Sequence, residues 1–163
     1  MKLYTPIKPL YNSIKISNTQ SVKDIVILIK RAIKESKPSA DLIAPQLKAG
    51  TKLQTLKNVY DFVKQIPYKK EPGENQTART LPRIIQGAIN GIGGDCKHYS
   101  IAIASLLESL NIPYKLRLIS QNFFDAEPTH IYVVTKINGN EVILDCVMDN
   151  FNNEAVYKYK YDI

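Results

Sequence analysis

The sequence has no tryptophan, only two cysteines and only two histidines. Two cysteines can form at most one disulfide, which excludes a small disulfide-stabilised scaffold. Because there is no Cys-x-x-Cys pair and there are so few imidazoles, we expect no dedicated zinc site, and no residue pattern indicates a cofactor. Any chemistry that combines a thiol with an imidazole must use Cys96 or Cys146 together with His98 or His130.

Long apolar runs are also missing. No stretch approaches the roughly 20 apolar residues that cross a bilayer, so we expect no membrane span. The first twenty residues lack the continuous apolar region of a secretory signal. We therefore expect a cytoplasmic protein, and incorporation into a larger particle such as a phage virion stays open.

The chain carries a net charge of +7 with 44% hydrophobic residues in 163, which is typical of one globular domain. A basic surface raises the question of nucleic acid. The lysines are scattered at spacings typical of solvated helix faces, and only Lys69-Lys70 and residues 158–160 form local clusters. We therefore do not expect nucleic-acid binding, although an anionic partner could use the same surface.

Helix signals dominate the first two thirds of the chain, and strand signals dominate the last third, which predicts an α+β fold. We expect an irregular arm over residues 1–20, a helical part over 21–66, a loop-rich connection over 67–93, and a helix followed by a sheet over 94–163, all in one domain. The individual helices are expected at 22–35, 39–47, from 52 to about 66, 82–89 and 96–110. Residues 67–81 are expected to form a long loop, and strands are expected at 114–120, 130–137, 141–147 and 155–161.

Asn138-Gly139 predicts a hairpin whose register follows from the two-residue turn. In that register Tyr132 lies opposite Asp145, so His130 and Asp145 become diagonal neighbours within reach of a hydrogen bond. One face of the hairpin is then expected to carry His130, Tyr132, Val134, Ile143, Asp145 and Val147. The other face is expected to carry Ile131, Val133, Ile137, Val142, Leu144 and Cys146, which makes Cys146 a buried, inert thiol.

Cys96 is expected at the first turn of a helix that Asp95 can cap. Helix N-termini favour the thiolate form of a cysteine, which is the nucleophilic form. Gly93-Gly94 could allow a substrate to approach the backbone, or could serve only a tight turn. His98 lies two residues from Cys96 on the helix and should face away from it, so we expect a surface or supporting residue and not the base.

These residues together resemble the transglutaminase-like superfamily, which includes papain-related cysteine acyl transferases and peptidases. The residues that carry the resemblance are Gly94-Asp95-Cys96, 102–107, Ile112-Pro113, 129–133 and 142–145, with a looser match upstream through Tyr68, Gln76 and residues 79–82. The resemblance implies a central Cys-bearing helix packed on an antiparallel sheet, as in small bacterial and phage members. It also implies a nucleophile at Cys96, a base at His130 and an orienting carboxylate at Asp145. The oxyanion would be held by the backbone N–H of Cys96 and one upstream donor, for which Gln76 is the candidate.

The chain also departs from the family pattern. Lys97-His98-Tyr99 follow the cysteine where many bacterial members carry acidic residues, and Cys146 follows the aspartate where many have a proline. The sequence therefore favours a cysteine hydrolase or peptidase that acts on a peptide or isopeptide amide, with a protein substrate favoured over a small molecule. The alternatives are a protein-cross-linking transglutaminase and a non-catalytic structural or binding module, for example a virion component with the same fold.

Overall fold

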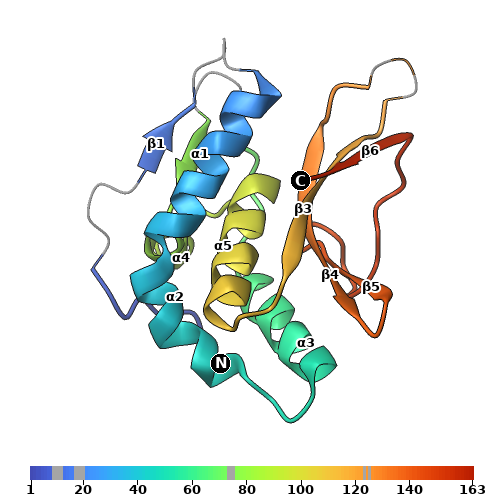
Figure 1. The fold of residues 1–163 in the computed structure, drawn as a ribbon. Helices are drawn as coiled ribbons and strands as arrows, with labels where there is room; N and C mark the ends of the chain where they lie inside the picture. The colour runs from blue at the N-terminus through green and yellow to red at the C-terminus, as the bar shows by residue number, and fades with distance from the viewer. Residues whose placement is uncertain (9–12, 17–20, 73–75, 123, 125) are drawn as a thin grey trace.

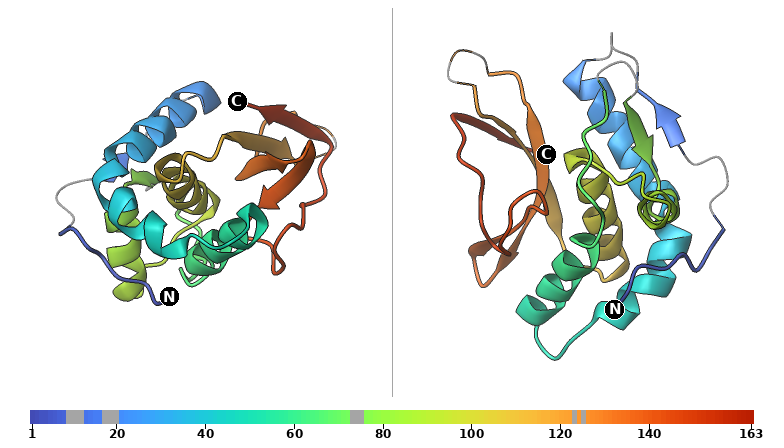
Figure 2. Two further views of the ribbon diagram at one scale, coloured as in Figure 1. Left: turned by 60° about the horizontal axis from the view of Figure 1, so that its bottom comes forward. Right: turned by 180° about the vertical axis from the view of Figure 1, so that it is seen from behind.

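Helix α5 (Cys96–Ser109) lies in the middle of the molecule, between other helices and an antiparallel sheet (Figure 1). The computed structural model describes residues 1–8, 13–16, 21–72, 76–122, 124 and 126–163. The side chains of α5 are buried from Lys97 to Leu107. Small residues such as Ala102 and Ala104 let the neighbouring elements approach α5 closely. Views from behind and from the end show the sheet on one side of α5 and α1 and α2 on the other (Figure 2).

The helices begin where the sequence provides caps. Ser21 accepts a hydrogen bond from the backbone N–H of Asp24, and Thr51 accepts one from Gln54. The predicted helix at 39–47 instead begins two residues earlier, because Pro38 occupies its first turn, and it tightens into a 3-10 turn at Pro45. The elements are α1 (Val22–Glu35), α2 (Lys37–Ile43), η1 (Ala44–Leu47), α3 (Lys52–Val63) and α4 (Leu81–Ile89).

The main sheet has four antiparallel strands in the order β5-β4-β3-β6. The predicted hairpin register is confirmed, with Ile137 paired to Asn140 and Val133 paired to Leu144. Asn138 and Gly139 both have positive φ, as the two-residue turn requires. The last strand is shorter than predicted and pairs with β3. The strands are β3 (Tyr114–Ser120), β4 (His130–Ile137), β5 (Asn140–Leu144) and β6 (Tyr159–Asp162).

A second, two-stranded sheet joins two segments that were expected to be irregular. Strand β1 (Ser13–Lys15) pairs antiparallel with β2 (Thr77–Arg79). The expectation of an irregular arm over 1–20 is therefore wrong for residues 13–15, and residues 9–12 and 17–20 lie outside the described part of the chain. The expected long loop likewise contains β2. This pairing joins segments more than sixty residues apart, so no local sequence signal announces it.

The two faces of the main sheet bury separate cores. Ile131, Val133, Val142, Leu144 and Cys146 join the core around α5, whereas Tyr132, Val134 and Ile143 pack with Ile119 and Ala155 on the outer face. For the apolar residues this division confirms the predicted alternation except at Val147, which packs on the core around α5. The exception arises because the chain leaves the sheet after Leu144 and turns. Within the described ranges, no helix combines the length and apolar character needed to cross a membrane.

Candidate active site

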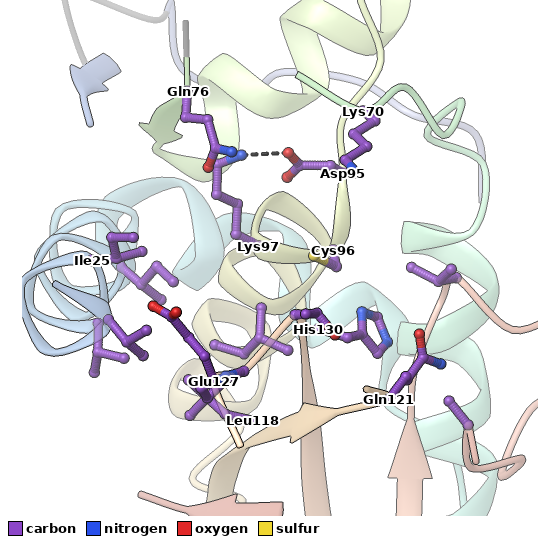
Figure 3. Close-up of a pocket in the computed structure, with 18 of the residues that line it drawn as sticks. Ile25, Lys70, Gln76, Asp95, Cys96, Lys97, Leu118, Gln121, Glu127 and His130 are labelled. Carbon is purple, nitrogen blue, oxygen red and sulfur yellow. Dashed lines mark hydrogen bonds and ion pairs between the residues drawn. The ribbon is translucent and has the colours of Figure 1, made fainter. Parts of the chain in front are cut away.

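A cavity of about 630 Å³ opens at the N-terminal end of α5 and is lined by three of the residues that the sequence singled out. Cys96, His130 and Gln76 all line it, together with residues of α1 and of the sheet (Figure 3). Three segments far apart in the chain thus contribute to one cavity. Its volume is in the range of pockets that enclose a small ligand or part of a peptide.

Cys96 is the first residue of α5 and its thiol is free and half-buried. Asp95 is the N-cap residue, as predicted. Because Cys96 lies in the first turn, its backbone N–H has no partner within the helix and can donate to a ligand. The helix N-terminus also favours negative charge at this point in the cavity.

The imidazole of His130 is held by Asp145. Nε2 of His130 donates to Oδ2 of Asp145 at 2.6 Å, and the backbone N–H of Val147 donates to Oδ1 at 3.0 Å. This arrangement leaves Nδ1 of His130 for the thiol of Cys96. Burial lowers the pKa of His130, but the hydrogen bonds with Asp145 and Cys96 outweigh burial and raise the pKa to about 9.

A side-chain contact fixes α5 against the strand that carries His130. The hydroxyl of Ser100, one turn after Cys96, lies 2.9 Å from the carbonyl of Cys96 and 3.1 Å from the carbonyl of Ile131. Ile131 follows His130 directly, so Ser100 connects the helix to the strand beside both groups. This contact therefore fixes the position of the helix that carries the thiol relative to the strand that carries the imidazole.

His98 is fully buried and contacts Arg79 and Asp95, so of the two expected roles, surface or supporting residue, its position fits the supporting one. Nε of Arg79 donates to Nε2 of His98 at 2.9 Å. Burial lowers the pKa of His98 and keeps its ring neutral. Nδ1 of His98 lies 3.2 Å from the backbone nitrogen of Asp95 and 2.9 Å from its Oδ1. His98 therefore orients the residue that caps α5.

The same region contains a buried ionic network that the sequence did not reveal. Nζ of Lys97 contacts Oδ2 of Asp95 and lies 3.0 Å from Oε2 of Glu71, while Arg79 lies 3.5 Å from Oε1 of Glu71. Two carboxylates are thus balanced by two cations, and the pKa of Asp95 is held well below its ordinary value because His98 and Lys97 outweigh its burial. Glu71 had no distinguishing signal in the sequence, and the looser family match over residues 79–82 gave Arg79 no role, because only the β1–β2 pairing and the loop path bring them here.

Possible metal ligands also meet in this network. Ligand atoms of Glu71, Asp95 and His98 lie within 4.8 Å of one another. However, Lys97 already contacts both carboxylates, and Arg79 contacts Glu71 and His98. A divalent cation would have to displace two buried cationic side chains, so these residues do not fit a metal site.

Gly93 and Gly94 serve the chain itself and not a substrate. The N–H of Gly94 donates to the carbonyl of Pro67 at 2.9 Å, and the N–H of Lys69 donates to the carbonyl of Gly94 at 2.8 Å. Gly93 has a φ of 72°, and a Cβ there would lie 2.5 Å from the carbonyl oxygen of Pro67. The close backbone approach expected at these glycines is therefore made by residues 67–69.

Gln76 and Cys146, the remaining two residues that the sequence singled out, lie in different surroundings. Gln76 lines the cavity, as does Lys97, and Figure 3 shows both on the same side of Cys96. Its role as an oxyanion donor stays a prediction, as do the roles of Cys96, His130 and Asp145. Cys146 is 1% exposed, and burial raises the pKa of its thiol strongly. This burial agrees with the expectation of an inert thiol.

The fold and the sequence each match known proteins. A protein from Parabacteroides distasonis, whose protease activity is a provisional assignment, superimposes with a TM-score of 0.55 at 15% identity over 72% of this chain. This chain spans only 25% of that protein. EGTA-treated LapG from Legionella pneumophila superimposes with a TM-score of 0.51 at 17% identity, over 81% of this chain and 74% of LapG. No curated protein matches the chain in sequence.

At these identities the superpositions establish the fold alone. The sequence profile of a transglutaminase-like domain, however, matches residues 39–160, which is most of the chain and includes Cys96, His130 and Asp145. Together with the α+β architecture around a central cysteine-bearing helix, this match shows that the chain belongs to the transglutaminase-like domain family.

Proposed function

We propose that the protein is a cysteine peptidase or amide hydrolase in which Cys96 is the nucleophile, His130 the base and acid, and Asp145 the group that orients the imidazole. The observation that carries this proposal is the hydrogen bond of 2.6 Å between Asp145 and His130, in a cavity that also exposes Cys96. Structural scaffolds have no need of a buried imidazole–carboxylate pair beside a half-exposed thiol.

The reaction starts with Cys96 and His130 of the resting site. The raised pKa of His130 favours the imidazolium below about pH 9, so the proton of Cys96 already lies on Nδ1 of His130 and the thiolate Sγ attacks the carbonyl carbon of the substrate amide while the C=O π electrons move to oxygen. The resulting oxyanion accepts a hydrogen bond from the backbone N–H of Cys96, and Gln76 is placed to supply a second donor. His130 then gives its proton to the amide nitrogen, the C–N bond breaks, and a thioester remains on Cys96.

Water completes the hydrolysis. His130 accepts a proton from the water molecule as its oxygen attacks the thioester, and the C–S bond breaks to release a carboxylic acid and restore the thiol. An amine could attack the same thioester and give transamidation. Hydrolysis is the proposed outcome because the site is an open cavity beside half-exposed and exposed residues, including Tyr68 and Lys70, so water can reach the thioester.

The proposal is tested by the selectivity of thiol alkylation. Under native conditions iodoacetamide should modify Cys96 at least about 100-fold faster than Cys146, because the Cys146 thiol is buried and its ionisation is suppressed. Intact-mass spectrometry with peptide mapping measures both rates. His130→Gln should slow the reaction of Cys96 and leave that of Cys146 unchanged.

Equal reactivity of the two cysteines would overturn the proposal and leave the non-catalytic module as the better interpretation. A reactive Cys96 that releases no amine from peptide substrates, but incorporates added amines, would replace hydrolysis with transamidation. The measurement is amine release from a casein digest, followed with and without added monodansylcadaverine.

A further inference from the structure

The cavity that contains Cys96 has two walls of different chemistry. Beyond Cys96 toward Gln76 the lining is polar and includes Lys70 and Lys97. Toward α1 and the sheet the lining is mainly aliphatic, and Figure 3 shows Ile25 and Leu118 on this side together with the acidic side chain of Glu127. The aliphatic wall consists of Val22, Ile25, Val26 and Ile29 from α1 with Leu118 and Ile131 from β3 and β4.

The α1 residues of this wall form one stripe of the helix, at the spacing i, i+3, i+4 and i+7. The continuation of that stripe, Ala32 and Ile33, is at most 2% exposed because α5 and its neighbours cover it. At the Cys96 end, in contrast, Val22, Ile25 and Val26 remain only half-buried. The apolar surface of α1 is therefore left incompletely covered where the cavity begins.

The incompletely covered part of α1 is adjacent to the thiol of Cys96. A substrate whose carbonyl carbon reaches Sγ of Cys96 has its flanking residues within the same cavity of about 630 Å³. Among side chains, only a branched aliphatic or similar group regains the contacts that α1, Leu118 and Ile131 otherwise leave open. On this side an acidic side chain would meet the like-charged Glu127 and the aliphatic wall, and a short side chain would leave the space unfilled.

The His130 ring lies on the other side of Cys96 from Ile25 (Figure 3). Because His130 must give its proton to the departing amine, the amine lies near His130 and the acyl part lies toward α1. The aliphatic wall is therefore on the acyl side of the amide that is cleaved.

We infer that the substrate is a peptide with a branched aliphatic side chain, such as leucine or isoleucine, within two residues on the acyl side of the amide that is cleaved, and that Ile25, Leu118 and Ile131 determine this preference. The inference rests on the proposed function, since it names the substrate of the same thiol. Each buried methylene favours the substrate by about fourfold, so leucine, which has three more carbons than alanine, should exceed alanine by about 10- to 100-fold.

The test uses peptidyl vinyl sulfones, which place a peptide on the acyl side of a group that alkylates the thiol. Acetyl-dipeptide vinyl sulfones with leucine, alanine or aspartate at the first or second residue before the warhead are reacted with the whole protein, and intact mass gives the rate constant for Cys96. The leucine probes should react about 10- to 100-fold faster than the alanine and aspartate probes. Equal rates for all probes would overturn the inference.

A matched pair of α1 variants distinguishes an effect of the aliphatic wall from a general effect of changing α1. Ile25→Asp should abolish the preference for leucine, whereas Ile27→Asp should retain it, because Ile27 is 62% exposed and does not line the cavity. Ile25→Ala, which is expected to reduce the preference about tenfold, provides the same test if Ile25→Asp does not fold. An unchanged preference in both Ile25 variants would overturn the inference.

The rate of alkylation by iodoacetamide reports on the reactivity of the Cys96 thiol and not on recognition by the aliphatic wall. Its rate with Cys96 should be the same in the natural protein and in Ile27→Asp, because Ile27 does not line the cavity. If iodoacetamide selects Cys96 while the vinyl sulfones show no side-chain preference, the aliphatic substrate is wrong and the proposed function stands. If iodoacetamide does not select Cys96, the proposed function itself fails.

Discussion

His130 and Asp145 meet just beyond the last paired residues of the β4–β5 hairpin, with Nε2 of the imidazole 2.6 Å from Oδ2 of the carboxylate. The ladder between these strands ends at the pair Val133 and Leu144. Asp145 therefore belongs to the turn that follows β5, and its second oxygen accepts from the backbone of Val147. One carboxylate oxygen of Asp145 thus accepts from the main chain, and the other accepts from the imidazole of His130.

Asp145→Asn should lower the turnover number by about 100-fold or more, with little change in the fold. An amide keeps the shape of the side chain but removes the negative charge that stabilises the imidazolium, and it disturbs the orientation of the ring. Peptide hydrolysis by purified variants provides the measurement. Asp149→Asn is the matched control, because the side chain of Asp149 is 99% exposed and lies outside the cavity. A turnover number for Asp145→Asn equal to that of the control would remove Asp145 from the mechanism.

The hairpin could be predicted from the sequence because its register depends on a local signal. Asn138-Gly139 fixes the pairing as far as Val133 and Leu144, which brings His130 and Asp145 into the same region, and the turn after β5 completes their contact. The position of Cys96 at a helix start could be predicted for the same kind of reason, since Asp95 is a strong N-cap residue.

The ionic network behind Cys96 could not be predicted. It joins Glu71 and Arg79 to the first turn of α5, and their proximity depends on the path of residues 67–80 and on the β1–β2 pairing. Those are long-range contacts with no periodic pattern in the sequence. The partner of Gly93-Gly94 could not be predicted for the same reason. The sequence indicated a close approach at these glycines but not that residues 67–69 make it.

The two imidazoles should titrate very differently. The hydrogen bond with Asp145 outweighs burial and raises the pKa of His130 to about 9, whereas burial lowers the pKa of His98. Ring-nitrogen NMR spectra, with only two histidines to resolve, should show one imidazole that stays charged to about pH 9 and one that stays neutral well below pH 6.5. His130→Gln assigns the signals by removing the first.

The two shifts have opposite consequences for stability. The folded-state pKa of His130 exceeds the unfolded value of about 6.5, so its contribution is complete below pH 6.5 and is lost as the pH rises to about 9. The folded-state pKa of His98 is below the unfolded value, so its neutral burial destabilises the fold as the pH falls below 6.5. Urea unfolding of His130→Gln should therefore show less loss of stability between pH 6.5 and 9 than the natural protein. An identical pH dependence would contradict the raised pKa.

His98→Ala should mainly reduce stability, by about 2–4 kcal/mol, because Arg79 and Asp95 lose a buried hydrogen-bonding partner. Urea unfolding at pH 7 provides the free energy, and hydrolysis at a temperature where the variant is folded provides the turnover number. Lys57→Ala, which removes an exposed ion pair with Asp61, should change stability by less than about 1 kcal/mol. If His98→Ala were as stable as Lys57→Ala but inactive, His98 and not His130 would be the base.

Gly93→Ala should destabilise the protein by about 2 kcal/mol or more and should slow the alkylation of Cys96. The φ of 72° disfavours any side chain, and the new Cβ would lie 2.5 Å from the carbonyl oxygen of Pro67. Residues 67–69 would have to move away from Gly94, which precedes the capping Asp95, so the start of α5 would lose its support. Gly50→Ala is the control, since a Cβ at Gly50 meets nothing within 4 Å. Urea unfolding and the iodoacetamide rate of both variants test the prediction. Equal stability of the two variants would mean that the backbone pairing beside Cys96 does not constrain the helix start.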